Sequence, residues 1–418
     1  MTIHNTSTAA LVANAFDRRS DPVEDLGLAA VDLAVACPDM AAQFTRGSRL
    51  LVFGNGAGAT DAQHVAVEFV HPVVAGRRAL PALCLVSDAA TLNGVATRTG
   101  WEGVYAHQIT VLGRPGDIAL GISSDGNCAN VREGLRAARR MGLLTIALLG
   151  GDGGAVSARN ESDHCLPIPS GDPHIVKEGH VTAYHLLWEL VHVFFDAQEL
   201  SRAHEGHGAE APFAQLYGGA NAPSVLDAVA GSVRQTVAEI VQLRRAVGVE
   251  QGPALAACAE QLADVFRAGG TLLAFGNGAS STDAQDLVHT FMEPPPPGDP
   301  LPALGLTNDV AVLTALSNDV GLEAVFAVQM GAFGRFGDAA VAISTKGDSP
   351  NVLAAINQAE RMGRLTIGLV GDGRGDMAEL SLLHHLFTVP SPSVQRVQEV
   401  QITLCHVLGE ATRAALIG

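Results

Sequence analysis

The sequence has few basic residues, and this shortage limits the partners that we expect. It contains 26 Lys and Arg against 43 Asp and Glu, which gives a formal net charge of −17 at pH 7. Such a charge argues against a nucleic-acid backbone or an anionic membrane as the main partner. It also means that local groups must hold any bound phosphate against an unfavourable overall field.

Long apolar runs and paired cysteines are also missing. No apolar stretch reaches the length needed to span a membrane. The first residues, MTIHNTSTAALVANAF, lack the basic start and apolar core of a secretory signal. The six cysteines are scattered, with no CxxC pair, which favours reduced thiols. We therefore expect a cytoplasmic protein.

What the chain does have is length and an internal repeat. Its 418 residues are more than one domain with a single hydrophobic core usually contains. Its content of 47% hydrophobic and 17% charged residues predicts packed domains rather than disorder. LLVFGNGAGATDAQHVAVEFV from Leu50 returns as LLAFGNGASSTDAQDLVHTFM from Leu272. We therefore predict one domain over 1–202 (copy 1), a linker rich in Gly, Ala and Pro over 203–224, and a second domain over 225–418 (copy 2).

Each copy has the pattern of an α/β fold. Leading helices are followed by short apolar runs that alternate with longer helical stretches. In copy 1 the short runs are RLLVFG, PALCLVS, DIALGIS, LLTIALLG and HCLPIP. Short buried strands alternating with helices predict a parallel sheet covered on both faces, hence three α/β/α layers. Ligands of such sheets bind at the carboxyl ends of the strands, so site residues are expected there.

Two kinds of polar turn follow predicted strands in each copy. The first is GNGAGA from Gly54 and GNGASS from Gly276. Its glycines let the backbone turn sharply, and the next helix offers free N–H groups to a ligand. The second is SSDGNC from Ser123 and STKGDSP from Ser344, whose hydroxyls and N–H groups make a phosphate cradle. Ordinary tight turns and N-caps explain each turn equally well when it is taken alone.

Charged and polar residues with helical spacing complete the pattern. His64 and Glu68 are four residues apart, so they lie on one helix face and can share a proton or a metal ion. The last predicted helix of each copy carries two polar residues about two turns apart. These pairs are Lys177 with His185 and Gln398 with His406. A solvated helix face and a structural histidine are the alternative explanations.

Together these motifs resemble the phosphoheptose isomerases of the SIS superfamily. The resemblance rests on GNGAGATDAQHVAVE, on the LPALxL run followed by Asp88 or Asp309, on the GIS-type loop and on the QEV-x5-H ending. It covers nearly the whole chain, twice, apart from the linker and the termini. It implies two tandem flavodoxin-like SIS domains.

The resemblance also implies an activity and a set of site residues. Family members interconvert an aldose and a ketose phosphate, such as sedoheptulose 7-phosphate, through an enediol(ate). In the family, a glutamate on a helix is the base and a histidine on the last helix is its acid partner. The matching residues here are Glu68 for the base and His185 or His406 for the acid. Some members bind zinc, and the matching ligands are His64, Glu68 and His185. The expected substrate-binding residues are Asn55, Gly56, Asp88, Ser123, Ser124, Asn127, Asn277, Ser280, Asp309, Ser344, Thr345, Lys346, Ser349 and Gln398.

Copy 1 departs from the family pattern in its phosphate cradle. It keeps Glu68 and both histidines, but Gly58, Asp125 and Cys128 stand where the family has serines, and Lys177 replaces a glutamine. Asp125 sets a negative charge beside an incoming phosphate. While it is charged, Lys177 cannot donate a lone pair to a metal, although it can pair with Glu68 or with a substrate phosphate.

Copy 2 departs from the pattern in its reacting groups. It keeps the hydroxyls of the cradle, to which Lys346 adds a positive charge. It lacks the base, because Thr290 occupies the glutamate position and Asp286 the histidine position. Copy 2 alone is therefore not expected to catalyse the family reaction.

Two functions of different classes follow from these departures. In the first, which we favour, the protein is an isomerase whose site lies within copy 1 or combines His64 and Glu68 with Gln398 and His406 across a pseudo-dimer. In the second, both copies have lost catalysis, and the protein binds a phosphorylated sugar as a regulator or accessory protein. Since the single-domain family forms tetramers, two copies per chain predict a homodimer with four SIS domains.

Overall fold

The structure is a computed structural model that describes residues 7–27, 30–74, 76–205, 222–296, 298–372 and 375–417. The side chains of 196–205 and 222–228 are not described. Most of the predicted linker, residues 206–221, lies outside the described residues.

Packing divides the chain into two compact units. One comprises residues 21–239, and the other comprises residues 1–20 together with 240–418. The first helix, α1 (Thr8–Asp17), thus belongs with copy 2, whereas the sequence repeat placed it in the copy 1 domain. It is held there by ion pairs of 2.6 and 2.7 Å from Arg18 and Arg19 to Glu410 of the last helix.

Each unit contains one parallel sheet of five strands. The first consists of β1 (Leu50–Gly54), β2 (Ala82–Cys84), β3 (Ile118–Ser123), β4 (Leu144–Gly150) and β5 (His164–Ile168). The second consists of β6 (Leu272–Gly276), β7 (Ala303–Gly305), β8 (Ala339–Ser344), β9 (Leu365–Gly371) and β10 (His385–Val389). The first sheet has the order β2-β1-β3-β4-β5, and the second has the equivalent order, β7-β6-β8-β9-β10. This flavodoxin-like order confirms the predicted fold class.

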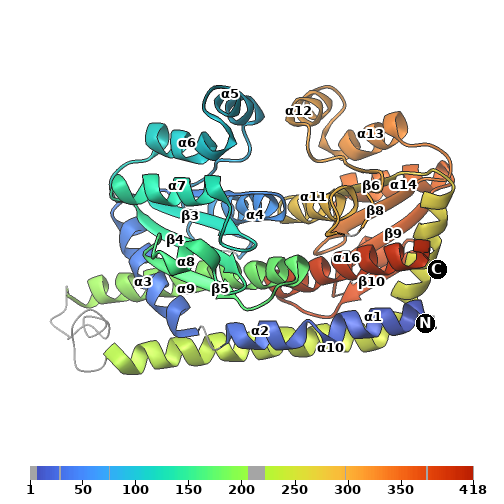
Figure 1. The fold of residues 1–418 in the computed structure, drawn as a ribbon. Helices are drawn as coiled ribbons and strands as arrows, with labels where there is room; N and C mark the ends of the chain where they lie inside the picture. The colour runs from blue at the N-terminus through green and yellow to red at the C-terminus, as the bar shows by residue number, and fades with distance from the viewer. Residues whose placement is uncertain are drawn as a thin grey trace, which may run out of the picture. The chain divides into compact units, whose positions relative to one another are not determined.

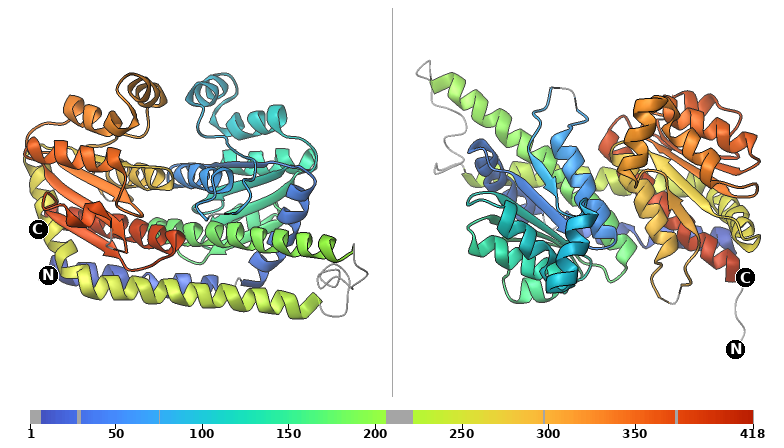
Figure 2. Two further views of the ribbon diagram at one scale, coloured as in Figure 1. Left: turned by 180° about the vertical axis from the view of Figure 1, so that it is seen from behind. Right: turned by 90° about the horizontal axis from the view of Figure 1, so that it is seen from above.

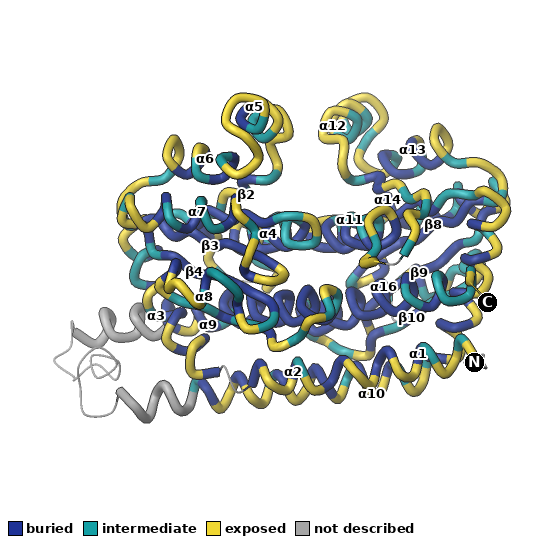
Figure 3. Tube along the Cα trace, in the orientation of Figure 1, coloured by how far each residue is buried: buried dark blue, intermediate teal, exposed yellow. Residues whose placement is uncertain are grey.

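Helices cover both faces of each sheet (Figures 1 and 2). Those of the first unit are α2 (Ser20–Leu26), α3 (Ala30–Thr45), α4 (Ala57–Val70), α5 (Ala89–Thr99), α6 (Val104–Leu112), α7 (Ala129–Arg140), α8 (Gly154–Ala158) and α9 (Pro173–Glu205), with a 3-10 turn at Trp101–Gly103. The central strands β1, β3 and β4 are buried along nearly their whole length (Figure 3), as expected of strands that are covered on both faces.

The second unit repeats this arrangement. Its helices are α11 (Ala279–Met292), α12 (Val310–Asp319), α13 (Val325–Phe333), α14 (Pro350–Arg361), α15 (Asp376–Glu379) and α16 (Val394–Ile417), with a 3-10 turn at Leu322–Ala324. The long helix α10 (Ala222–Arg267) precedes β6 and contributes residues to both units. None of the described helices combines the length and the apolar content needed to cross a lipid bilayer.

The glycine-rich turn after the first strand sets the direction of the next helix. Gly56 has a φ of 53°, a left-handed conformation that favours glycine, and α4 begins directly after it. A Cβ on Gly54 would lie only 2.6 Å from the carbonyl oxygen of Gly58. These glycines therefore allow α4 to start close against the strand ends, and α4 then packs against α9.

Candidate functional site

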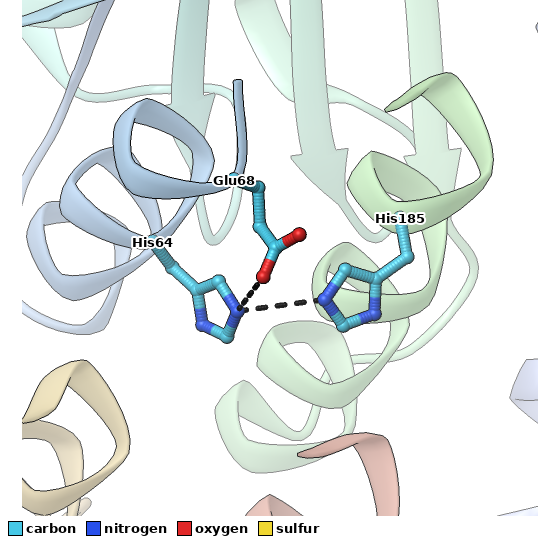
Figure 4. Close-up of side chains that lie close together, drawn as sticks. All are labelled: His64, Glu68 and His185. Carbon is cyan, nitrogen blue, oxygen red and sulfur yellow. Dashed lines mark hydrogen bonds and ion pairs between the residues drawn. The ribbon is translucent and has the colours of Figure 1, made fainter. Parts of the chain in front are cut away.

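Three chemically active side chains meet between α4 and α9 in the first unit (Figure 4). His64 and Glu68 come from α4, and His185 comes from α9. The Nε2 atoms of the two histidines lie 3.4 Å apart, and His64 Nε2 lies 3.8 Å from Glu68 Oε1. All three side chains are at most 2% exposed. The face that carries His64 and Glu68 therefore points into the protein and not toward solvent.

The surroundings of this cluster keep His64 neutral. Burial, and then the nearby His185 and Lys177, hold the pKa of His64 well below its usual range. A neutral imidazole keeps a lone pair, which can accept a proton or bind a metal. The ligand atoms of His64, Glu68 and His185 all lie within 4.8 Å of one another. Two imidazoles and one carboxylate are the protein ligands of many catalytic zinc sites, so these residues fit a metal ion.

Lys177 forms a buried ion pair beside this cluster. Its ammonium group contacts the Asp61 carboxylate and donates a hydrogen bond of 3.1 Å to Thr60 Oγ1. His180 Nδ1 lies 3.8 Å from the second oxygen of Asp61. Lys177 thus pairs with Asp61, a partner that its sequence position did not indicate.

Sequence reasoning missed some of these neighbours. From the sequence, no role was assigned to Asp61, His180 or Tyr184. The Tyr184 ring lies 5.1 Å from the His64 ring and 5.0 Å from the His185 ring, measured between centroids. The available signal was spacing, because Lys177, His180 and Tyr184 recur at three and four residues and so share one face of α9.

The corresponding place in the second unit holds a different pair. His406 Nε2 on α16 lies 2.8 Å from Asp286 Oδ2 on α11, and both side chains are about 1% exposed. Thr290 and Gln398 are also buried there. Among the described residues of copy 2 there is no group of three side chains that could hold a metal ion as His64, Glu68 and His185 could.

The two phosphate cradles differ in the hydrogen bonds that their hydroxyl and carboxylate groups form. In copy 1, Ser123 Oγ accepts from the Gly126 N–H at 3.0 Å and donates to Asp125 at 3.2 Å. Asp125 also accepts from the Asn127 N–H at 2.9 Å, so its charge sits within the loop. Ser124 remains exposed at the surface.

In copy 2, Ser344 Oγ accepts from the Gly347 N–H at 2.9 Å. A hollow of about 540 Å³ opens beside this loop, and Thr345, Lys346 and Asp348 are among its lining residues. Ser349 precedes α14 as its N-cap residue, and Ser280 is buried in the first turn of α11. This loop thus presents a cation and a hydroxyl to an open hollow, whose lining also includes the carboxylates of Asp348, Asp372 and Asp376.

Several residues that were predicted to contact the substrate form hydrogen bonds within the protein. The amides of Asn55 and Asn130 bond each other at 2.8 and 2.9 Å, and Asn277 and Asn351 do the same in copy 2. The other residues of this kind accept hydrogen bonds from backbone N–H groups. Asp88 caps α5, Asp309 caps α12, and Asn127 Oδ1 accepts from the Ala155 N–H. These hydrogen bonds explain the presence of the polar side chains even without a bound ligand. The role of these residues in substrate binding stays a prediction.

Comparison with known proteins places this geometry in a family. Residues 25–150 and 236–371, more than half of the chain, match the SIS domain. The chain belongs to the SIS domain family. Both matched regions begin in helices that lead into a parallel sheet, and together they include Glu68, Ser123 and Ser344.

This SIS-domain chain is similar to shorter relatives and to a solved structure. It is 43% identical over 168 residues to a phosphoheptose isomerase of Pelobacter propionicus, which covers 39% of this chain and 88% of the relative. A phosphoheptose isomerase of Desulfovibrio desulfuricans is 42% identical over 193 residues, or 45% and 88% of the two chains. The C-terminal domain of glucosamine-fructose-6-phosphate aminotransferase from Francisella tularensis shares the fold, with a TM-score of 0.62, 11% identity and coverage of 97% and 96%.

Proposed function

We propose that this SIS-domain protein is an aldose–ketose isomerase for a phosphorylated sugar of the heptose type, such as sedoheptulose 7-phosphate. The observation that carries the proposal is the buried group of His64, Glu68 and His185, which sets a carboxylate and two imidazoles together. The likeness to phosphoheptose isomerases supports the substrate class. A protein that only binds a sugar phosphate has no evident use for such a group.

In the proposed mechanism Glu68 moves a proton between two neighbouring carbons. For a ketose, the Glu68 carboxylate takes a proton from the carbon next to the carbonyl, and the C–H electron pair forms the double bond of an enediolate. His185, in its acid form, protonates the former carbonyl oxygen. The neighbouring hydroxyl then returns a proton to His185 as the new carbonyl forms, and Glu68 delivers its proton to the second carbon. Neither residue is changed at the end of the cycle.

We further propose that His64, Glu68 and His185 can hold zinc. A histidine bound to zinc cannot also carry the acid proton, so the metal would then replace His185 at the substrate oxygens. When bound, such an ion would polarise the carbonyl and stabilise the enediolate oxygens. Titration calorimetry should detect one zinc ion per chain, and His64→Gln should remove it. His406→Gln is the matched control in copy 2 and should leave zinc binding unchanged; loss of zinc binding in this control would contradict the assignment.

The homodimer with four SIS domains also remains a proposal. It rests on the two SIS regions in one chain and on the tetramers that the resemblance to the single-domain isomerases implies. Light scattering coupled to size-exclusion chromatography should give twice the mass of one chain. A lone monomer across micromolar concentrations would contradict it.

Turnover tests the proposed function against its alternative, a sugar-phosphate-binding regulator. The full chain is incubated with sedoheptulose 7-phosphate and, separately, with fructose 6-phosphate, and the products are followed by NMR. We expect conversion of the heptose phosphate into its aldose isomer. Saturable binding of the heptose phosphate without any turnover would overturn the enzyme and support the regulator.

A further inference from the structure

Arginines gather at the end of α7 and in the segment after α8, in the first unit. A hollow of about 560 Å³ is lined by Arg136, Arg139, Arg140, Arg159, Asn160 and Glu161. We call this hollow the arginine groove. Four arginines around one hollow are unexpected in a protein whose net charge is −17.

The arginine groove lies away from the proposed isomerase site. Helix α7 begins just after the loop at 123–128 and ends at Arg140, so its twelve residues span about 18 Å. Asn160 and Glu161 come shortly before β5, which starts at His164. The groove therefore lies at the amino ends of the strands, opposite the edge where the sugar is expected to bind. A ligand in the groove would not occupy the isomerase site.

The arginines of the groove differ in whether they form ion pairs with the residues that the structure describes. Glu161 is 6% exposed and accepts two hydrogen bonds of 2.9 Å from Arg132 and two from Arg136, one of them 3.1 Å long. This network fixes one wall of the groove. Arg140 and Arg159 are exposed, and neither forms an ion pair with any residue that the structure describes.

Copy 2 shows that the fold does not require these arginines. With the offset of 221 that relates Ser123 to Ser344, leucines replace the groove residues Arg159 and Glu161 and also Arg132, the partner of Glu161. Arg132, Arg159 and Glu161 correspond to Leu353, Leu380 and Leu382. Those leucines pack against the hydrophobic core of their unit. Copy 1 thus has an ionic network beside the groove, where copy 2 has leucines that pack on its hydrophobic core.

Favourable charge at a helix end does not explain the groove either. A cation near a helix C-terminus is stabilised by the helix dipole, and one residue in the last turn is enough for this. Copy 2 meets that need with Arg361, the counterpart of Arg140. Arg136 and Arg159 have no basic counterpart in copy 2, where Asn357 and Leu380 stand instead.

We propose that the arginine groove binds a small anion that carries two or more linked phosphates. Guanidinium groups form paired hydrogen bonds with phosphate oxygens, and several of them around one hollow match a chain of phosphates. The hollow is shallow and wide open to solvent, and its volume of about 560 Å³ is in the range of small-molecule sites. The protein's strong negative charge would repel a long polyanion such as a nucleic acid, which favours a compact ligand.

Calorimetric titration of the full chain with inorganic tripolyphosphate tests this proposal. We expect one site per chain, tighter binding of tripolyphosphate than of orthophosphate, and affinity that falls as sodium chloride is raised. The double variant Arg140→Gln/Arg159→Gln should weaken binding by at least about tenfold. Both side chains are exposed, so the variant should fold, which its circular dichroism and thermal melt would confirm.

Two matched variants separate the groove from other phosphate-binding places. Arg361→Gln changes the counterpart of Arg140 in copy 2, and Lys346→Gln changes the copy 2 cradle; both should leave the tripolyphosphate site intact. Two equal sites per chain, unchanged affinity in the double variant, or equally tight binding of a polyglutamate peptide would overturn the proposal. These results do not depend on isomerase turnover.

Discussion

The two copies place different chemistry at the same two helices. In copy 1, α4 and α9 bring together a carboxylate and two imidazoles, whereas in copy 2, α11 and α16 bring together one imidazole and one carboxylate, His406 and Asp286. The only two lysines of the sequence are divided between the copies. Lys177 is buried in an ion pair beside the copy 1 cluster, and Lys346 is exposed on the copy 2 cradle.

This comparison separates what the fold supplies from what the side chains supply. Both units have the same strand order and the same left-handed glycine before the first site helix, with φ of 53° and 56°. The backbone therefore presents equivalent positions in both copies. The side chain at each position therefore decides the chemistry: a carboxylate at Glu68 in copy 1 and a hydroxyl at Thr290 in copy 2. On this basis we propose that copy 1 serves proton transfer and that copy 2 holds the phosphate.

The largest expected effect concerns the histidine that partners Glu68. His185→Asn should lower the isomerase rate by about 10² to 10⁴-fold, because it removes the acid that serves the substrate oxygens. His406→Asn, its counterpart in copy 2, should change the rate little. Steady-state kinetics of both variants with the heptose phosphate make the comparison. A large loss in His406→Asn and none in His185→Asn would favour a site shared between the copies.

The next effect concerns stability and the buried lysine. Lys177→Met leaves the Asp61 carboxylate buried without its cation, which should lower the free energy of unfolding by about 3–5 kcal/mol. Adding Asp61→Asn should recover part of this loss. Gln398→Met, the same position in copy 2, removes no charge and should cost less. Urea unfolding followed by circular dichroism compares them, and equal losses in both single variants would show that the ion pair has no special role.

The smallest effect concerns the two cradles. Because Lys346 adds a positive charge and Asp125 a negative one, a sugar phosphate should occupy the loop at 344–349 before the loop at 123–128. Lys346→Glu should weaken binding by about tenfold, since screening by solvent reduces the interaction of exposed charges, and Asp125→Ser should strengthen binding at copy 1. A crystal soaked with a heptose phosphate, with calorimetry of both variants, checks this. Density at 123–128 alone would contradict it.

Much of the fold could be predicted from the sequence because its signals are local. Strand runs, glycine turns and the repeat fix two parallel sheets, and four-residue spacing placed His64 and Glu68 on one face. The position of α1 could not be predicted in this way, because it depends on Arg18 and Arg19 meeting Glu410 almost 400 residues later. Likewise, the pairing of Lys177 with Asp61 is decided by packing between α4 and α9, which spacing along the chain does not show.

The central claim is that the reacting base belongs to copy 1 alone. The most direct test is the rate of heptose phosphate isomerisation by Glu68→Gln and by Thr290→Val, which change equivalent positions of the two copies. Glu68→Gln keeps the size and the hydrogen bonding of the side chain but removes the base. We predict that Glu68→Gln abolishes turnover with the fold intact and that Thr290→Val retains it. An unchanged rate in Glu68→Gln would contradict the claim.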